Sequence, residues 1–232
     1  MSATAQIGVT TLIGAERAET IFSRFKAKHP DVALEYREGA VEELHSMFKH
    51  RQADLIIVPH DADFELDPDI LRLPLMLEQL FFIPRFSERS RWEAMECVTV
   101  SDIAAEAFAL LPDNCGLTRT TRHLFHSQGH AINAYEHRAT GYQSMLDFVD
   151  ASLCSVTLPE SKIRDYTGTV IPIVDNGRPV AIEYVVFGQA SNLPRKKFTE
   201  LWDCLLESKL TVTRPSPCST TPAFSGIKSA TN

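Results

Sequence analysis

Two adjacent hydroxyl side chains, Thr10 and Thr11, lie where the apolar run AQIGV gives way to polar, helix-forming residues. Paired threonines at such a junction can act as a nucleophile, as a cradle for an anion, or as a cap for the helix. An anion there would meet the two hydroxyls and the free amides at the positive end of the helix dipole. A plain threonine N-cap would contribute about 1 kcal/mol of stability. One strand-to-helix junction can serve as both cap and cradle.

A second polar loop, PDNCGLT, joins a later predicted strand to a helix. Asn114 and Thr118 can each donate and accept a hydrogen bond, and Gly116 lets the backbone approach a ligand. An ordinary asparagine cap is the alternative. Cys115 could be a nucleophile, but no His–Asp partner can be assigned to it from the sequence. We therefore expect this loop to contact a ligand and its thiol to be structural or a bystander.

Four histidines, His123, His126, His130 and His137, gather in the next stretch. The first three would share a helical face, but Gly129 is expected to end the helix before His130. No HExxH motif and no carboxylate at ligand spacing accompanies them, so a solvated or dimer-facing surface is favoured over a metal site. We also find no G-x-S-x-G, P-loop or G-x-G-x-x-G motif, and HDADFELDPD departs from an EF-hand loop. We predict no catalytic residue, metal or cofactor.

Short apolar runs alternate with segments of helical period along most of the chain. The predicted strands are AQIGV, VALEY, ADLIIVP, ILRLPL, QLFFIPRF, AFALLP, AINAYEHRA, SLCSVTLP and VAIEYVVFG. Five helices are predicted. The first ends near His29–Pro30, the second carries Val41, Leu44, Met47 and Phe48, and the third spans Thr118 to Gln128. The fourth carries Tyr142, Met145, Leu146 and Val149, and the fifth covers PRKKFTELWDCLLES, with the buried stripe Phe198, Leu201, Trp202 and Leu205. This alternation predicts an α/β fold with mostly parallel sheets, and its two successive runs predict two subdomains.

Composition narrows the class of protein further. The 232 residues are 44% hydrophobic and 23% charged, with a formal net charge of −7, which disfavours direct binding to nucleic acid. The five cysteines are scattered without a C-x-x-C pair, as is typical of reduced thiols. No signal peptide or membrane-spanning run is evident, so we expect a soluble, cytoplasmic protein without membrane contact. The Ser-, Thr- and Pro-rich segment 211–232 is predicted to be disordered.

Several stretches, taken together, resemble the effector-binding domain of LysR-type transcriptional regulators. They are the opening I-G strand, the F-x-x-x-x-P-D-V turn from Phe25 to Val32, the pair Glu38-Gly39, and the helix leading to ADLIIV. VTVSDIAAEAFALLP and FVDASLCSVTLPES resemble later segments of the family. The resemblance covers residues 5 to 208. Ser152 stands where the family usually has glycine, and the helix after Thr11 lacks the usual Leu-Pro.

The resemblance implies a periplasmic-binding-protein-like fold of type II, with two Rossmann-like subdomains and a cleft between them. Subdomain I would take 1–80 plus 172–210 and subdomain II 81–171, with crossings near Phe81–Pro84 and Ile171–Val174. In the family the hydroxyl pair at Thr10 and Thr11 contacts the effector. The other expected effector-binding positions follow at strand ends facing the cleft. The full predicted set is Thr10, Thr11, Leu12, Ala40, Pro59, His60, Asn114, Cys115, Gly116, Thr118, Thr140 and Gly141.

The leading functional hypothesis is therefore a regulatory domain, not an enzyme, that binds a small-molecule effector, expected to be an organic or aromatic carboxylate. The family implies a homodimer or homotetramer that uses helices near 15–28 and 118–128. Such a regulator would bind DNA only through a helix-turn-helix domain, which the sequence as given does not include. The alternatives are a stand-alone small-molecule binding protein, or an enzyme that reuses the cleft with Cys115 or His60 as its reactive group. A Cys–His or Cys–Asp pair inside the cleft would favour the enzyme.

Overall fold

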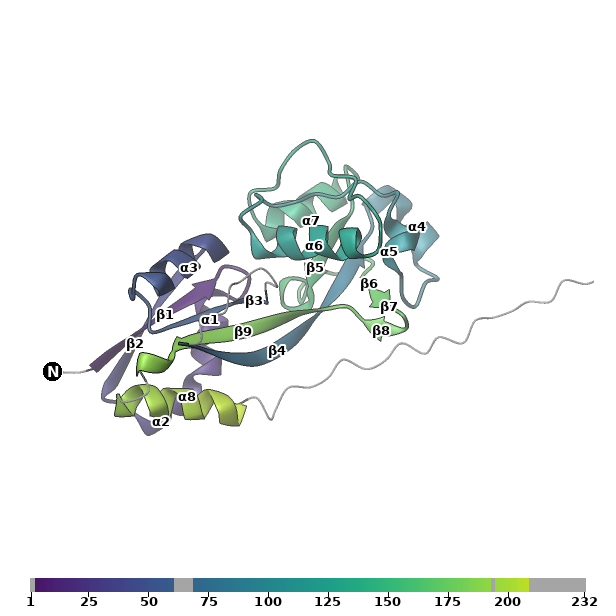
Figure 1. Ribbon diagram of the computed structural model, residues 1–232. Coiled ribbons are helices and arrows are strands. Elements are labelled where there is room, and N and C mark those ends of the chain that lie inside the picture. The colour runs from purple at the N-terminus through teal and green to yellow at the C-terminus, as the bar shows by residue number, and fades with distance from the viewer. Residues whose placement is uncertain (1–2, 61–68, 193–194, 209–232) are drawn as a thin grey trace, which may run out of the picture.

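The computed structural model describes residues 3–60, 69–192 and 195–208 (Figure 1). The predicted solvated connection HDADFELDPD falls mostly within residues 61–68, and the predicted disordered tail within 209–232, so both lie outside the described residues. No described helix is both long and apolar enough to cross a membrane. The described chain forms two lobes, which share two long strands.

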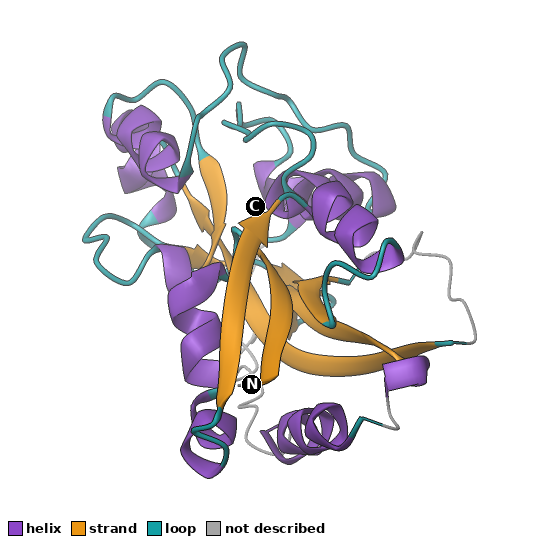
Figure 2. Ribbon diagram, turned by 90° about the vertical axis from the view of Figure 1, so that its left-hand side faces the viewer, coloured by secondary structure: helices purple, strands orange, loops and turns teal. Residues whose placement is uncertain are grey.

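Lobe I is built on three parallel strands in the order β2-β1-β3. Helices lie on either side of these strands (Figure 2). Every residue of β3 is buried, as expected for a strand covered on both faces. The predicted helix near residues 15–28 is divided at Phe22 into α1 and α2. The elements of lobe I are β1 (Ala3–Thr10), α1 (Gly14–Ile21), α2 (Ser23–Lys28), β2 (Val32–Gly39), α3 (Val41–Lys49), β3 (Leu55–Pro59), η3 (Ala190–Asn192) and α8 (Lys196–Ser208).

Two antiparallel strands, β4 (Ile70–Ile83) and β9 (Ala181–Gln189), run from lobe I toward lobe II (Figure 1). The prediction of two strands, ILRLPL and QLFFIPRF, was wrong, because a β-bulge between Pro74 and Met76 keeps one strand continuous past a proline. The prediction of mostly parallel sheets was also wrong. β9 returns from lobe II and pairs antiparallel with both β3 and β4.

Lobe II is a smaller sheet with short helices packed around it. At Leu80, β4 changes its main partner and pairs antiparallel with β5, and β6 pairs with its end. The strand β4 is therefore shared by both lobes. The elements of lobe II are η1 (Phe86–Glu88), α4 (Arg89–Trp92), α5 (Val100–Ile103), α6 (Gly116–Ser127), α7 (Tyr142–Asp150), β5 (Val156–Pro159), η2 (Glu160–Lys162), β6 (Ile171–Pro172) and the hairpin of β7 (Val174–Asp175) and β8 (Arg178–Pro179).

Two predicted strands of lobe II, AFALLP and AINAYEHRA, are not strands in the structure. Only isolated parallel bridges join Phe108 to Ala134 and to Ser155. The two segments contact each other at the backbone of Leu110, whose carbonyl accepts from Ala139, and at Phe108, whose amide donates to Asn133 and whose carbonyl accepts from Tyr135. Between these contacts the polar residues of the second segment turn into an exposed bend, so no ladder forms. The buried apolar residues that suggested strands instead pack in an irregular loop.

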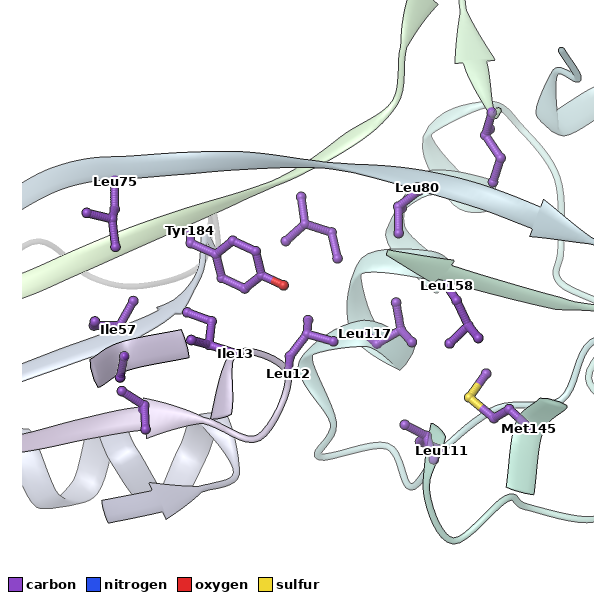
Figure 3. Packing of buried hydrophobic residues seen from close by; sticks show 14 of the residues in the cluster. Leu12, Ile13, Ile57, Leu75, Leu80, Leu111, Leu117, Met145, Leu158 and Tyr184 are labelled. Atoms are coloured by element: carbon purple, nitrogen blue, oxygen red, sulfur yellow. The ribbon is translucent and has the colours of Figure 1, made fainter. Parts of the chain in front are cut away.

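The core is continuous across the junction of the lobes. Buried side chains of lobe I, including Leu12, Ile13 and Ile57, belong to the same hydrophobic cluster as Leu117 and Met145 of lobe II. Figure 3 shows Leu12 and Leu117 facing each other beneath the crossing strands. A second, smaller cluster packs α3 against the other face of the lobe I sheet. The two lobes therefore share buried contacts as well as strands.

Candidate ligand-binding cleft

Several helices begin around one space between the lobes. β1 ends at Thr10, while Ala40, Cys115 and Gly141 are the N-cap residues of α3, α6 and α7. No side chain caps the N-terminus of α3 or α6. Because a helix N-terminus presents free amides and the positive end of a dipole, this arrangement favours an anion.

A cavity of about 310 Å³ occupies this space, and we call it the cleft cavity. Lobe I contributes the end of β1 and the start of α3, and lobe II contributes the starts of α6 and α7 with their preceding loops. Most of the predicted binding residues are gathered here. The lining residues are Thr10, Thr11, Ala40, Leu111, Pro112, Asn114, Cys115, Gly116, Thr140, Gly141 and Tyr142.

The remaining predicted residues lie elsewhere. Leu12 is fully buried in the core, and Thr118 is buried, with its hydroxyl donating to the carbonyl of Leu111 at 3.0 Å. Pro59 and His60 line a separate cavity of about 590 Å³, which we call the β3-end cavity. Its residues are Val41, Pro59, His60, Gly116, Arg119, Thr120, Arg122, His123, Ala181, Ile182 and Glu183.

The charged groups of the β3-end cavity are already compensated by protein partners. His60 lies 3.8 Å from Glu183, and Arg119 pairs with Glu42 at 2.6 Å. Arg122 pairs with Asp113 at 3.3 Å. A ligand there would compete with existing ion pairs, whereas the cleft cavity is lined by hydroxyls, amides and helix starts. We therefore take the cleft cavity as the candidate site.

The threonine pair is not the N-cap of α1, so the alternative of a plain threonine cap was wrong. The N-cap of α1 is Ile13, and no side chain of that residue can serve the helix. Thr10 is buried, and its hydroxyl accepts from the Leu12 amide at 3.4 Å. The N-terminal turn of α1 is held instead by Glu38, whose Oε1 accepts from the Ala15 amide at 2.7 Å. A protein carboxylate thus already occupies part of the positive end of this helix.

Tyr142 connects the two sides of the cleft. Its hydroxyl is hydrogen-bonded to the Thr11 side chain and lies 3.9 Å from Cys115 Sγ. Burial, with a smaller effect from Cys115, raises the pKa of Tyr142 well above its usual value, so the phenol stays protonated. The sequence had placed Tyr142 in the buried stripe of its helix. As the first residue of α7 it lines the cavity, while Met145 is in the core.

Charged side chains lie behind the wall of the cleft. Glu78 of β4 is buried, forms an ion pair with Arg17 at 2.8 Å and accepts from the Ser161 amide at 2.8 Å. Burial alone would raise the pKa of Glu78, but the Ser161 and Arg17 contacts outweigh it and hold the pKa below 4.5. Lys162 Nζ lies 4.7 Å from the centroid of the Tyr142 ring, and burial lowers the pKa of this lysine. Burial and the Glu78 charge raise the pKa of Tyr184.

The reactive-group alternatives receive little geometric support. Within the described ranges, no histidine or carboxylate lies within hydrogen-bonding distance of Cys115 Sγ, whose one polar neighbour is Tyr142. Likewise, no group of three or more potential metal ligands occurs among the described residues. The helix of the histidine cluster ends at Ser127, before Gly129 as predicted, and His130 Nε2 lies 3.0 Å from Ser101 Oγ instead.

Sequence reasoning missed Leu111, Pro112 and Tyr142 among the lining residues, and Lys162 behind them. Leu111 and Pro112 lie three and two residues before Asn114, and Tyr142 follows Gly141, so extending each selected loop by three residues would have found them. Lys162 carried no such signal, since it lies beyond the strand end at Pro159 in a stretch without a recognisable motif.

Comparisons with known proteins agree with this architecture. Residues 1–209 match the LysR substrate binding domain family. No curated protein matches the chain. Among solved structures, the effector-binding domain of QuiR in complex with shikimate aligns with a TM-score of 0.73 at 17% identity, covering 92% of this chain and 100% of that one. The regulatory domain of Synechocystis PCC6803 CcmR in complex with 2-PG aligns with a TM-score of 0.72 at 14% identity, covering 91% and 100%.

A longer protein shares the same fold. Full-length CbnR, in a complex with its target DNA, aligns with a TM-score of 0.72 at 12% identity, covering 90% of this chain and 71% of that one. At these identities the structural matches establish the fold, a type II periplasmic-binding-protein-like arrangement of two lobes with a cleft between them. The match over residues 1–209 establishes more than the fold: this chain belongs to the LysR substrate binding domain family.

Proposed function

We propose that the chain is a regulatory domain that binds a small organic or aromatic acid in the cleft cavity. The observation that carries this proposal is the convergence of the β1 end with the N-termini of α3, α6 and α7 on one cavity. The N-termini of α3 and α6, which have no side-chain caps, provide amides for an anion, and the hydroxyl of Thr11 can orient it. The QuiR domain was solved in complex with shikimate and the CcmR domain in complex with 2-PG, and these complexes support the same class of ligand.

In this proposal the ligand acts by changing the relative pose of the lobes. Thr10 and Thr11 belong to lobe I, whereas Asn114, Thr140 and Tyr142 belong to lobe II, so a ligand in the cavity contacts both. A ligand that binds one pose better than another shifts the population toward it. In a cytoplasmic homodimer or homotetramer assembled through α1, α2 and α6, this shift would be transmitted to helix-turn-helix DNA-binding domains of the kind found in the family. Full-length CbnR, which shares this fold, is known in a complex with its target DNA, and this supports such a route.

A stand-alone binding protein is the alternative within the same cleft, and it predicts the same ligand contacts without a transcriptional partner. An enzyme is less well supported, because Cys115 lacks a base among the described residues and His60 lies in the other cavity. A cleft lined by hydroxyls and amides is suited to binding rather than to nucleophilic catalysis.

A screen of organic acids by thermal shift, followed by calorimetry, tests the proposal. An acid present at about 100 times its Kd stabilises the protein by about 2.7 kcal/mol, which corresponds to a rise in Tm of roughly 5–10 °C at this size. Thr11→Val should weaken binding by about three- to tenfold, because it removes one hydrogen bond. Thr20→Val is the matched control, since Thr20 is an exposed threonine of α1 whose hydroxyl donates to the Glu16 carbonyl of the same helix, away from the cavity. No binding by any acid, or equal affinity in Thr11→Val, would contradict the proposal.

A further inference from the structure

Lys162 places a positive charge beside the cleft cavity. It ends η2, just after β5, and its Nζ lies 4.7 Å from the centroid of the Tyr142 ring. That ring forms part of the cavity wall, and its hydroxyl meets Thr11 on the opposite lobe. An ammonium over an aromatic face is stabilised by the ring, but much less than by a carboxylate.

This charge has no ion-pair partner in the part of the chain that the structure describes. No carboxylate there lies within 4.0 Å of Lys162 Nζ. Two lysines on the surface are paired instead: Lys26 pairs with Glu19 at 2.8 Å, and Lys197 pairs with Asp31. Lys162 is half-buried, and burial lowers its pKa because a charge removed from water is costly. The protein therefore maintains at the cleft a costly cation without a direct ion-pair partner among the described residues.

The acids nearest to Lys162 act on it only from a distance, because other groups engage them. Glu78 forms its ion pair with Arg17, and Glu38 holds the Ala15 amide at the start of α1. The same Glu38 contact takes up part of the positive end of α1. A carboxylate entering the cleft would thus meet the starts of α3, α6 and α7, with Lys162 as a nearby full positive charge, whereas the start of α1 is already taken up by Glu38.

We propose that Lys162 is the counter-charge for the carboxylate of a ligand in the cleft cavity and determines the preference of the site for anions over neutral analogues. This inference rests on the proposed function, since it assigns the charge selectivity of the same cavity. The long, flexible stem of lysine lets its ammonium leave the ring face and approach a ligand. In a site partly shielded from water, a single charge of opposite sign has a large effect on affinity.

The test compares each acid with its neutral analogue. Calorimetric titrations use benzoate with benzamide, salicylate with salicylamide, and shikimate with its methyl ester, against the wild type, Lys162→Met and Lys162→Arg. We expect Lys162→Met to reduce the acid-over-neutral preference by about tenfold or more, and Lys162→Arg to retain most of it. Lys26→Met, which removes a surface lysine of α2, should leave the preference unchanged.

The outcomes separate this inference from the function on which it rests. If acids bind and depend on Thr11, but Lys162→Met keeps the wild-type acid-over-neutral preference, the role of Lys162 is overturned and the proposed function stands. If no acid of the three pairs binds the wild type, both are overturned. Thermal unfolding without ligand checks the variant itself. Because removing an uncompensated half-buried charge relieves a cost, Lys162→Met should unfold at the same or a higher temperature than the wild type.

Discussion

At the scale of single residues, Glu78 connects more parts of the molecule than any side chain that the sequence singled out. It lies on β4, its carboxylate meets Arg17 of α1, and it accepts from the amide of Ser161 in η2. The carboxylate is buried, whereas the side chain of Arg17 is 28% exposed. A buried carboxylate with two donors favours its ionised form, so its folded-state pKa lies below the usual 4.5. This residue therefore couples the lobes in a pH-dependent way.

Glu78→Gln should destabilise the protein near neutral pH by about 2–3 kcal/mol, less than for a fully buried pair because Arg17 is partly hydrated. Because the folded pKa is depressed, the stabilisation is present above the unfolded value of about 4.5. It is lost as the pH falls through the folded value. Urea unfolding at pH 7 and at acidic pH measures the difference between wild type and variant, which should shrink toward acid. Glu19→Gln, which breaks the surface pair with Lys26, is the control and should cost under about 1 kcal/mol. A pH-independent difference would contradict this account of Glu78.

At the scale of elements, the start of α6 packs against the end of β3 with no room for a side chain. A Cβ on Gly116 would lie 2.8 Å from Cγ of Pro59 and 3.4 Å from Val41. The proline ring is rigid, so the helix or the strand end would have to move. Gly116 lines both cavities, and its close approach sets the spacing between the lobes at the cleft. The start of α7 differs, because a Cβ on Gly141 would meet no atom within 4 Å.

Gly116→Ala is therefore expected to destabilise the protein by about 1–3 kcal/mol through overpacking. Gly141→Ala is a matched glycine-to-alanine change at another helix start, with an extended φ of −170° that any residue can adopt. It should alter stability by no more than about 0.5 kcal/mol. Denaturant unfolding of both variants gives the comparison. Equal stability of the two variants would show that the contact between α6 and β3 yields easily.

Elements with a strong apolar stripe were predictable, and those defined by a few backbone contacts were not. α7, α8 and the buried strand β3 follow directly from the spacing of their apolar residues. The strands proposed for AFALLP and AINAYEHRA failed, because an apolar run does not reveal whether a neighbouring ladder exists beyond Phe108. The same distinction applies to the residues of the candidate site. Positions at strand ends gathered at the cavity, whereas tertiary packing that no local pattern encodes places Lys162 and Glu78 behind its wall.

At the scale of the whole molecule, the two lobes are less separate than their connection by crossing strands implies. One hydrophobic cluster contains Leu12 of lobe I, Leu80 of the crossing strand, and Leu117 and Leu158 of lobe II (Figure 3). These side chains are all buried. Moving one lobe against the other would therefore require these leucines to repack.

This shared core predicts that the lobes unfold together. Differential scanning calorimetry should give one transition in which calorimetric and van't Hoff enthalpies agree. Leu117→Ala, which opens a cavity at the junction, should cost about 2–5 kcal/mol and lower Tm by roughly 5–15 °C. Leu206→Ala truncates an exposed leucine of α8 and should change Tm little. Two resolved transitions in the wild type would show that each lobe holds its own stability, and the cleft would then join independently folding units.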